Sequence, residues 1–153
     1  MTLRRRVNST VGCLSVMTIV EIFDSLPNGL HDAYLRGINL NYAERVAALH
    51  LDIWVGNMSL DGEAREARRE VVLKLSGLCY FVVEAPDSNY DFHEPKPLWI
   101  DAGVESLASE RSSVKLPETP EGAFTFWMYV NDWNAFIHVA AMKAGLESPA
   151  GVL

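Results

Sequence analysis

Two apolar runs separated by a short polar break constrain the fold of this chain more than any other feature. The first run covers residues 124–130 and the second covers residues 133–141, and both are rich in apolar and aromatic side chains. The break between them, Asn131-Asp132, is typical of the turn in a β-hairpin. A hairpin that is apolar on both faces must bury both of them. The sequence predicts this hairpin but leaves open whether a helix, a loop or a second copy of the chain covers its second face.

Alternating apolar and polar residues predict further antiparallel strands. Residues 34–42 alternate, with Tyr34, Ile38, Leu40 and Tyr42 on one face and Asn39 and Asn41 on the other. After a short turn, residues 45–55 alternate again, and their outer face is polar. Residues 98–100 are short and apolar and predict one more strand. Such patterning is typical of antiparallel sheets that bury one face and expose the other.

Two runs rich in β-forming side chains, residues 71–75 and 78–85, are interrupted by Ser76-Gly77. Gly77 marks either a bulge within one long bent strand or the turn of a tight hairpin. We favour the bulge, because a two-residue hairpin turn usually contains Asn or Asp.

The strands and one short helix predict the fold class. Residues 18–26 place apolar side chains on one face at helical spacing, and Pro27 ends this segment. Six to eight strands with this helix indicate an all-β domain, either an antiparallel sandwich or a strongly curved sheet, whose N-terminal helix plugs one end or covers an edge. We expect a single domain over residues 18–145 and a flexible tail over residues 146–153.

The first residues of the chain are interpreted as a leader. Three arginines and an apolar stretch resemble a signal peptide, but the stretch is short, is broken by Ser15 and Thr18 and lacks a small-residue cleavage site. We expect residues 1–17 to be a leader that is either disordered or misassigned, with translation then starting at Met17. No run approaches the roughly 18 apolar residues of a membrane-spanning helix.

Charge and cysteine usage exclude several classes of partner. The 153 residues carry a net charge of −7, which argues against nucleic acid and anionic membranes because both attract basic surfaces. The two cysteines, Cys13 and Cys79, form neither a disulfide framework nor a Cys-x-x-Cys metal motif. We therefore expect a cytoplasmic protein without a cofactor that binds a protein partner or associates with itself as a homodimer.

Two His–Asp pairs are candidates for a ligand-binding or partner-binding site. His31 and Asp32 precede the first strand, and such a pair can bind metal or act as acid and base, although neighbours in a strand point to opposite faces. His50 and Asp52 share a strand face, which Trp54 continues as the floor of a shallow pocket. Ordinary polar surface remains the alternative for both pairs, and a zinc site needs three or four ligands. We assign no metal site.

The aromatic residues of the hairpin are a further candidate surface. Trp127 and Tyr129 share one face of the first hairpin run, and both residue types are enriched at interfaces. The sequence contains neither a Gly-x-Ser-x-Gly elbow nor a glycine-rich phosphate loop. Cys79 lies in an apolar strand, where a packed thiol is inert. We therefore assign no catalytic residue.

Three blocks, residues 28–33, 73–78 and 130–137, resemble those of small, mostly bacterial β-rich proteins of unknown function. Some members of that grouping are similar to immunity proteins of polymorphic toxin systems. The resemblance covers the chain from about residue 19 to residue 141. It implies a compact cytoplasmic interaction protein and carries over no catalytic residue.

Two functional hypotheses follow. The first is a non-enzymatic protein that uses an acidic, aromatic-bearing surface to bind a protein partner, as an immunity protein would bind a basic toxin. The second is a small-ligand or metal-binding β-domain, including a hydrolytic one, with a site around His50, Asp52 and Trp54 that His31 or His138 completes.

Overall fold

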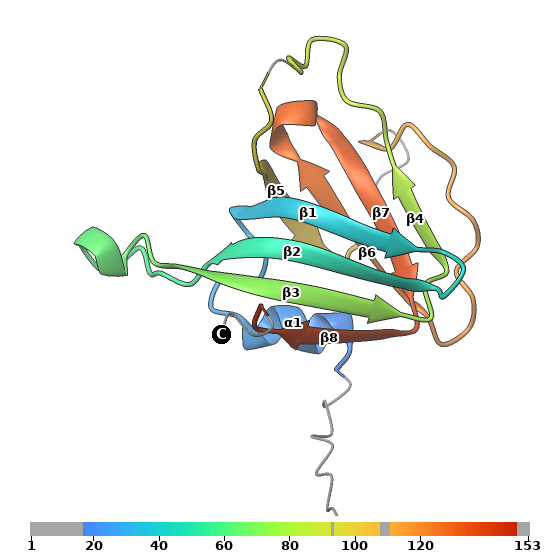
Figure 1. The fold of residues 1–153 in the computed structure, drawn as a ribbon, viewed down its shortest axis with the longest axis horizontal. Helices are drawn as coiled ribbons and strands as arrows, with labels where there is room; N and C mark the ends of the chain where they lie inside the picture. Colours follow the sequence, from blue (N-terminus) through green and yellow to red (C-terminus); the bar gives the residue numbers. More distant parts are fainter. Residues whose placement is uncertain (1–16, 93, 108–110, 150–153) are drawn as a thin grey trace, which may run out of the picture.

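A computed structural model describes residues 17–92, 94–107 and 111–149 (Figure 1). The described residues form one α-helix and eight strands. In chain order these are α1 (Ile19–Ser25), β1 (Ala33–Asn41), β2 (Val46–Trp54), β3 (Arg68–Ser76), β4 (Tyr80–Val83), β5 (Leu98–Gly103), β6 (Phe124–Val130), β7 (Ala135–Ala141) and β8 (Lys143–Glu147). Two short 3-10 helices, η1 (Gly62–Ala64) and η3 (Asn131–Trp133), lie between strands. All but the last residue of the predicted leader lies outside the described residues.

The strands form one antiparallel sheet in the order β4-β7-β6-β5-β1-β2-β3-β8. The sheet is strongly curved, so that β1, β2, β3 and β8 form a layer in front of β5, β6, β7 and β4 (Figure 1). It remains open, with β4 and β8 as its edge strands. The predicted all-β class with a short N-terminal helix is thereby confirmed. Because β8 extends to Glu147, Leu146 and Glu147 belong to the sheet and not to the predicted tail.

The predicted hairpin is formed by β6 and β7. Their register runs from Phe124 opposite Ala141 to Val130 opposite Ala135. The turn is longer than the expected Asn-Asp pair, because it includes η3 and ends at Asn134, whose φ of 49° lies in the left-handed region. The side chains of β7 are buried along its whole length, as its apolar sequence requires.

A bulge in β1 places Tyr34 and Ile38 on opposite faces of the sheet, although the alternation predicts that they share one. The register of β1 against β2 shifts between Leu35 and Gly37, so that Arg36 is an extra residue. Leu35 therefore packs into the core before the bulge and Ile38 packs against the core after it. Strict alternation through the segment cannot predict this change of face.

A shared bend in two long strands turns the sheet back on itself. Ser76 pairs with Lys143 in β3–β8, and Tyr80 pairs with Ala140 in β4–β7. Between these two pairs the β3–β4 segment runs four positions, from 76 to 80, whereas the β7–β8 segment runs only three, from 140 to 143. The β3–β4 segment therefore contains one extra residue. Gly77 has a φ of 62° here. The predicted bulge within one bent strand is consistent with this register.

The turn between β1 and β2 covers the β4 edge. The hydroxyl of Tyr42 donates to the carbonyl oxygen of Phe81 at 2.8 Å and accepts from the Phe81 amide at 3.0 Å. The amide of Leu78 donates to the carbonyl of Arg45 at 2.9 Å, and Arg45 Nε donates to the carbonyl of Leu78 at 3.0 Å. One phenolic hydroxyl therefore satisfies both backbone groups of Phe81, which would otherwise form an unpaired strand edge.

Replacing Tyr42 with phenylalanine is expected to lower the free energy of unfolding by about 1 kcal/mol, because the Phe81 amide and carbonyl lose their partner. Urea unfolding at neutral pH measures this effect. Tyr129→Phe is the matched control, since the Tyr129 hydroxyl bonds only to the exposed side chain of Asn134 among the contacts of the described residues. Equal stability of the Tyr42→Phe protein and the native protein would contradict the edge-sealing role.

The helix α1 covers the inner surface of the sheet near β8. Thr18 accepts a hydrogen bond from the Glu21 amide while the Glu21 carboxylate accepts from the Thr18 amide, a reciprocal N-cap. Ile19 and Ile22 are 1% and 0% exposed, and Phe23 meets Phe126 edge to face. No helix within the described ranges is long and apolar enough to cross a membrane.

Loops of the same chain cover the second face of the hairpin. Phe136 and His138 point away from the main core, yet each is only 3% exposed. The carboxylate of Glu84, just after β4, accepts from the Phe136 amide at 2.7 Å. Ser112 and Arg111, from the connection between β5 and β6, contact the same face. A second subunit is therefore not needed to bury it.

Candidate functional site

Aromatic and charged side chains from four adjacent strands meet on the outer face of one corner of the sheet. Tyr34 of β1 lies directly opposite Trp99 of β5 on one side and Asp52 of β2 on the other. Trp54, at the end of β2, lies opposite Arg68 at the start of β3. This corner is where the β2–β3 connection leaves the body of the protein (Figure 1).

A cleft of about 330 Å³ opens at this corner. We call it the aromatic cleft, and its lining residues are Asp32, Tyr34, Trp54, Met58, Glu66, Arg68 and Trp99. The guanidinium carbon of Arg68 lies 4.5 Å from the centre of the Tyr34 ring, and Arg68 Nη1 donates to the carbonyl of Asp32 at 3.0 Å. Trp99 Nε1 donates to Asp32 Oδ1 at 2.9 Å. The side chains of the cleft are therefore held in place by one another.

His31, Asp32 and Asp101 form a polar cluster at the edge of the cleft. His31 Nδ1 lies 2.6 Å from Asp101 Oδ1, and His31 Nε2 lies 3.3 Å from Asp32 Oδ2. Asp101 Oδ1 also accepts from the Asp32 amide at 3.1 Å, and Asn131 Nδ2 donates to Asp101 Oδ2 at 3.3 Å. Within the described part of the chain, these three residues are the group whose ligand atoms lie close enough together to hold a metal ion. They supply fewer ligands than a closed structural zinc site.

The backbone explains why His31 and Asp32 face one another. Both precede β1, so strand alternation does not apply to them, and Asp32 has a φ of 51°. The preceding turn is fixed by Asn28, whose side-chain amide donates to the carbonyls of Trp54 and Gly56, each at 3.0 Å. Asp101 belongs to β5, so it lies next to His31 and Asp32 because β5 pairs with β1 and not because of the local sequence.

The structure does not gather His50, Asp52 and Trp54 into one site. All three share the outer face of β2, as the alternation predicts. His50 Nε2, however, lies 3.0 Å from Asn39 Nδ2, whereas Asp52 Oδ2 accepts from Arg36 Nη2 at 3.1 Å. Trp54 alone of the three lines the aromatic cleft.

Trp127 and Tyr129 form part of the packing on the second face of the hairpin. Trp127 Nε1 donates to the carbonyl of Glu105 at 2.9 Å, and the Tyr129 hydroxyl donates to Asn134 Oδ1 at 2.6 Å. Their rings lie 5.6 Å and 5.1 Å from the ring of Phe136, measured between centroids. Both residues are thus engaged with the chain's own loops.

A buried polar cluster under these loops joins Glu84, Ser112 and His138. The Glu84 carboxylate accepts from Ser112 Oγ and from the Ser113 amide, each at 2.8 Å, and lies 3.3 Å from His138 Nε2. Burial is the largest single influence and raises the pKa of Glu84, but the hydrogen bonds that it accepts, first among them that of the Phe136 amide, together outweigh burial and lower the pKa below its usual value.

This cluster contains the residue types of a hydrolase triad but not its geometry. In such a triad the histidine faces the serine with one ring nitrogen and the acid with the other. Here His138 Nε2 faces both Ser112 Oγ, at 3.4 Å, and Glu84, at 3.3 Å. Ser112 donates directly to Glu84, so the serine proton is held by the acid instead of the imidazole. We assign the cluster a structural role.

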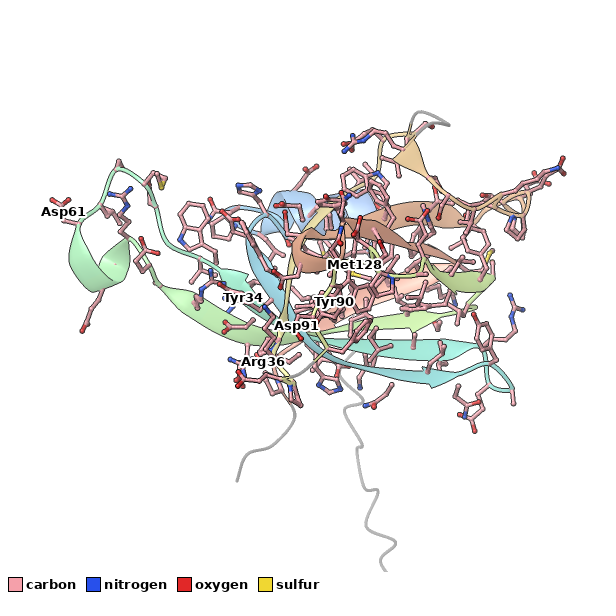
Figure 2. The ribbon with its side chains drawn as sticks, turned by 90° about the horizontal axis from the view of Figure 1, so that it is seen from above. Tyr34, Arg36, Asp61, Tyr90, Asp91 and Met128 are labelled. Atoms are coloured by element: carbon pink, nitrogen blue, oxygen red, sulfur yellow. The ribbon has the colours of Figure 1, made fainter. Side chains whose placement is uncertain are left out.

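The connection between β2 and β3 projects from the body as an arm, residues 55–67 (Figure 1). The Val55 amide donates to the carbonyl of Ala67 at 2.8 Å and closes its base. Trp54 Nε1 donates to the carbonyl of Arg65 at 2.7 Å across it. Met58 is 64% exposed and Leu60 is 46% exposed, and Figure 2 shows the neighbouring Asp61 far from the body. The arm is therefore a hydrogen-bonded projection that carries apolar side chains.

No protein-family model, no curated protein and no solved structure matches this chain. Function is therefore inferred from the geometry of the arm and the aromatic cleft. Sequence reasoning had singled out Asp32 and Trp54 but not the rest of the cleft. Tyr34 was missed because of the bulge in β1, and Trp99 and Arg68 because cross-strand neighbours are not visible in the sequence.

Proposed function

We propose that this protein is a non-enzymatic binding module whose arm docks onto a basic protein partner. The observation that carries the proposal is the exposure of Met58 and Leu60 on an ordered projection. Exposed apolar side chains within a polar rim are typical of the centre of an interface. Because hydrogen bonds already fix the arm, its ordering costs little further entropy when the partner binds.

The charge of the arm indicates the chemistry of its partner. Its three carboxylates are Asp61, Glu63 and Glu66, and its one basic residue is Arg65, so its formal charge is −2. The whole chain carries −7. A basic surface would be attracted to this arm and steered toward it. An immunity-type role, in which the arm masks a basic region of a toxin, is the form of this proposal that the sequence resemblance favours. We place the protein in the cytoplasm, which fits the free thiol of Cys79.

Loss of the apolar tip is expected to reduce capture of the partner at least about tenfold, the scale of an interface hot spot. The test compares the native chain with a Met58→Ser/Leu60→Ser double variant as baits in lysate of the source organism, with captured proteins quantified by mass spectrometry. Leu40→Ser is the matched control, because Leu40 is 41% exposed and lies at the end of β1 that is remote from the arm. Capture of a basic protein should also weaken as salt is raised.

Three outcomes would contradict the proposal. They are equal capture by the double variant, captured proteins that are acidic, and capture of no specific protein. Sedimentation of the purified chain tests a fourth outcome, in which the arm binds a second copy of the chain. A dimer that dissociates in the double variant would identify the arm as a homodimer contact and overturn the basic partner.

A further inference from the structure

We infer that the aromatic cleft binds a neutral saccharide unit, at a site that shares Met58 but not Leu60 with the protein contact proposed for the tip of the arm. The cleft measures about 330 Å³, near the lower end of the range of about 300–1,000 Å³ for small-molecule sites. Its lining comes from β1, β2, β3, β5, the arm and the turn before β1. Such a space holds a ligand of one or two rings.

Aromatic rings supply the apolar part of the site. Trp99 is 42% exposed and lies directly opposite the half-buried ring of Tyr34 across β5 and β1. Trp54 completes the aromatic lining. A pyranose ring has a C–H face that packs against such rings, while its hydroxyls remain at the rim. Aromatic side chains provide this contact area at little loss of conformational freedom.

The charges of the cleft select a neutral ligand. Arg68 is anchored inside it by Tyr34 and the Asp32 carbonyl, so its guanidinium already occupies the position over the Tyr34 ring that a cationic ligand would take. The carboxylates of Asp32 and Glu66, with Asp101 next to Asp32, would repel an anion. An entirely apolar ligand would remove these charged groups from water without compensation. A ligand with an apolar face and several hydroxyls fits all three conditions.

Hydroxyl groups match the polar atoms of the cleft because each one donates and accepts. Ionised Asp32 and Glu66 accept only, and Arg68 donates only. Bonds from a hydroxyl to these charged groups are stronger than bonds between neutral groups. Trp99 Nε1 holds Asp32 Oδ1 at 2.9 Å, and Trp54 Nε1 is held by the Arg65 carbonyl at 2.7 Å, so the site is ordered before a ligand arrives.

The test titrates the full chain with methyl glycosides of glucose, galactose, mannose and N-acetylglucosamine, followed by tryptophan fluorescence and NMR. We expect at least one neutral sugar to bind saturably in the millimolar range or tighter, with shifts at Trp99 and Trp54. Glucosamine and glucuronate, the cationic and anionic comparisons, should bind more weakly. Preference for either charged sugar, or no saturable binding in the panel, would overturn the inference.

Substitutions locate the site and separate it from the arm contact. Trp99→Ala should weaken binding at least tenfold, and Glu66→Gln, at a side chain 75% exposed, should weaken it severalfold without endangering the fold. Phe92→Ala removes a ring that is 72% exposed outside the cleft and should leave binding unchanged. Leu60→Ser, which tests the arm, should also leave it unchanged because Leu60 does not line the cleft. Native-like sugar binding in both Trp99→Ala and Glu66→Gln would refute the assignment even if partner capture succeeds.

Discussion

Replacing Phe136 with alanine is expected to lower the free energy of unfolding by about 3–5 kcal/mol, the range for a buried phenylalanine. Phe136 is 3% exposed although it points away from the main core. Its ring contacts the rings of Trp127, Tyr129 and His138, and the Arg111 guanidinium lies over it at 5.6 Å. Removal of the ring would leave a cavity between the hairpin and its covering loops. Urea or thermal unfolding measures the loss.

Phe92→Ala is the matched control for this prediction. Phe92 is 72% exposed and touches the ring of Tyr90, so its removal should change stability by less than about 0.5 kcal/mol. A small effect of Phe136→Ala, similar to that of the control, would mean that the loops do not form a second core over β7.

Replacing Glu84 with glutamine is expected to lower the free energy of unfolding by about 2–3 kcal/mol near pH 7, since charged groups form the stronger buried hydrogen bonds. The carboxylate accepts from two backbone amides, those of Phe136 and Ser113, as well as from the Ser112 hydroxyl. A glutamine would present an NH₂ group to some of these donors and leave them unpaired. Chemical unfolding at several pH values measures both the loss and its pH dependence.

The sign of the pH dependence follows from the lowered pKa of Glu84. A group with a lowered folded-state pKa stabilises the fold above its unfolded pKa, here near the usual 4.5, and loses that contribution as the pH falls through the folded-state pKa. The difference in free energy of unfolding between the native protein and Glu84→Gln should therefore be largest at neutral pH and should shrink at pH values below about 4.5. If this difference in free energy of unfolding stays constant down to strongly acidic pH, ionised Glu84 is not the stabilising form.

Glu118→Gln controls for the loss of one negative charge, because Glu118 is exposed in the β5–β6 connection. Its free energy of unfolding should stay within about 0.5 kcal/mol of the native value. Comparable destabilisation by the two substitutions would assign the effect to overall charge instead of the buried contacts.

Local patterns were sufficient to predict much of the fold. Apolar runs on either side of Asn131-Asp132 predicted β6 and β7, and period-two alternation predicted β2 with its outer face. The bulge at Arg36 was not predictable, because the sequence does not show which residue of a strand lacks a partner. The length of the β6–β7 turn was also not predicted. The turn continues through Asn134, which adopts a left-handed conformation that Asn tolerates, and the sequence does not show this.

The candidate site was predictable only in part, since its residues are joined by pairings between distant strands. Asp32 and Trp54 stood out by residue type and position. Nothing local to Asp32 indicates that Asp101 and Trp99 lie beside it, because the β1–β5 pairing is long-range. The contact of Glu84 with His138 has the same origin in the β4–β7 pairing. Residue type identifies candidates, but strand order decides which of them meet.

The bend shared by the β3–β4 and β7–β8 segments also governs when this chain can fold during synthesis. Ser76 pairs with Lys143, so β3 lacks its outer neighbour until β8 has left the ribosome. β4 likewise waits for β7. Long-range pairings of this kind slow folding, and unpaired strands in a nascent chain invite association with other chains. The sheet is therefore completed only once β8 has been made, and until then β3 and β4 are the strands most open to association with other chains.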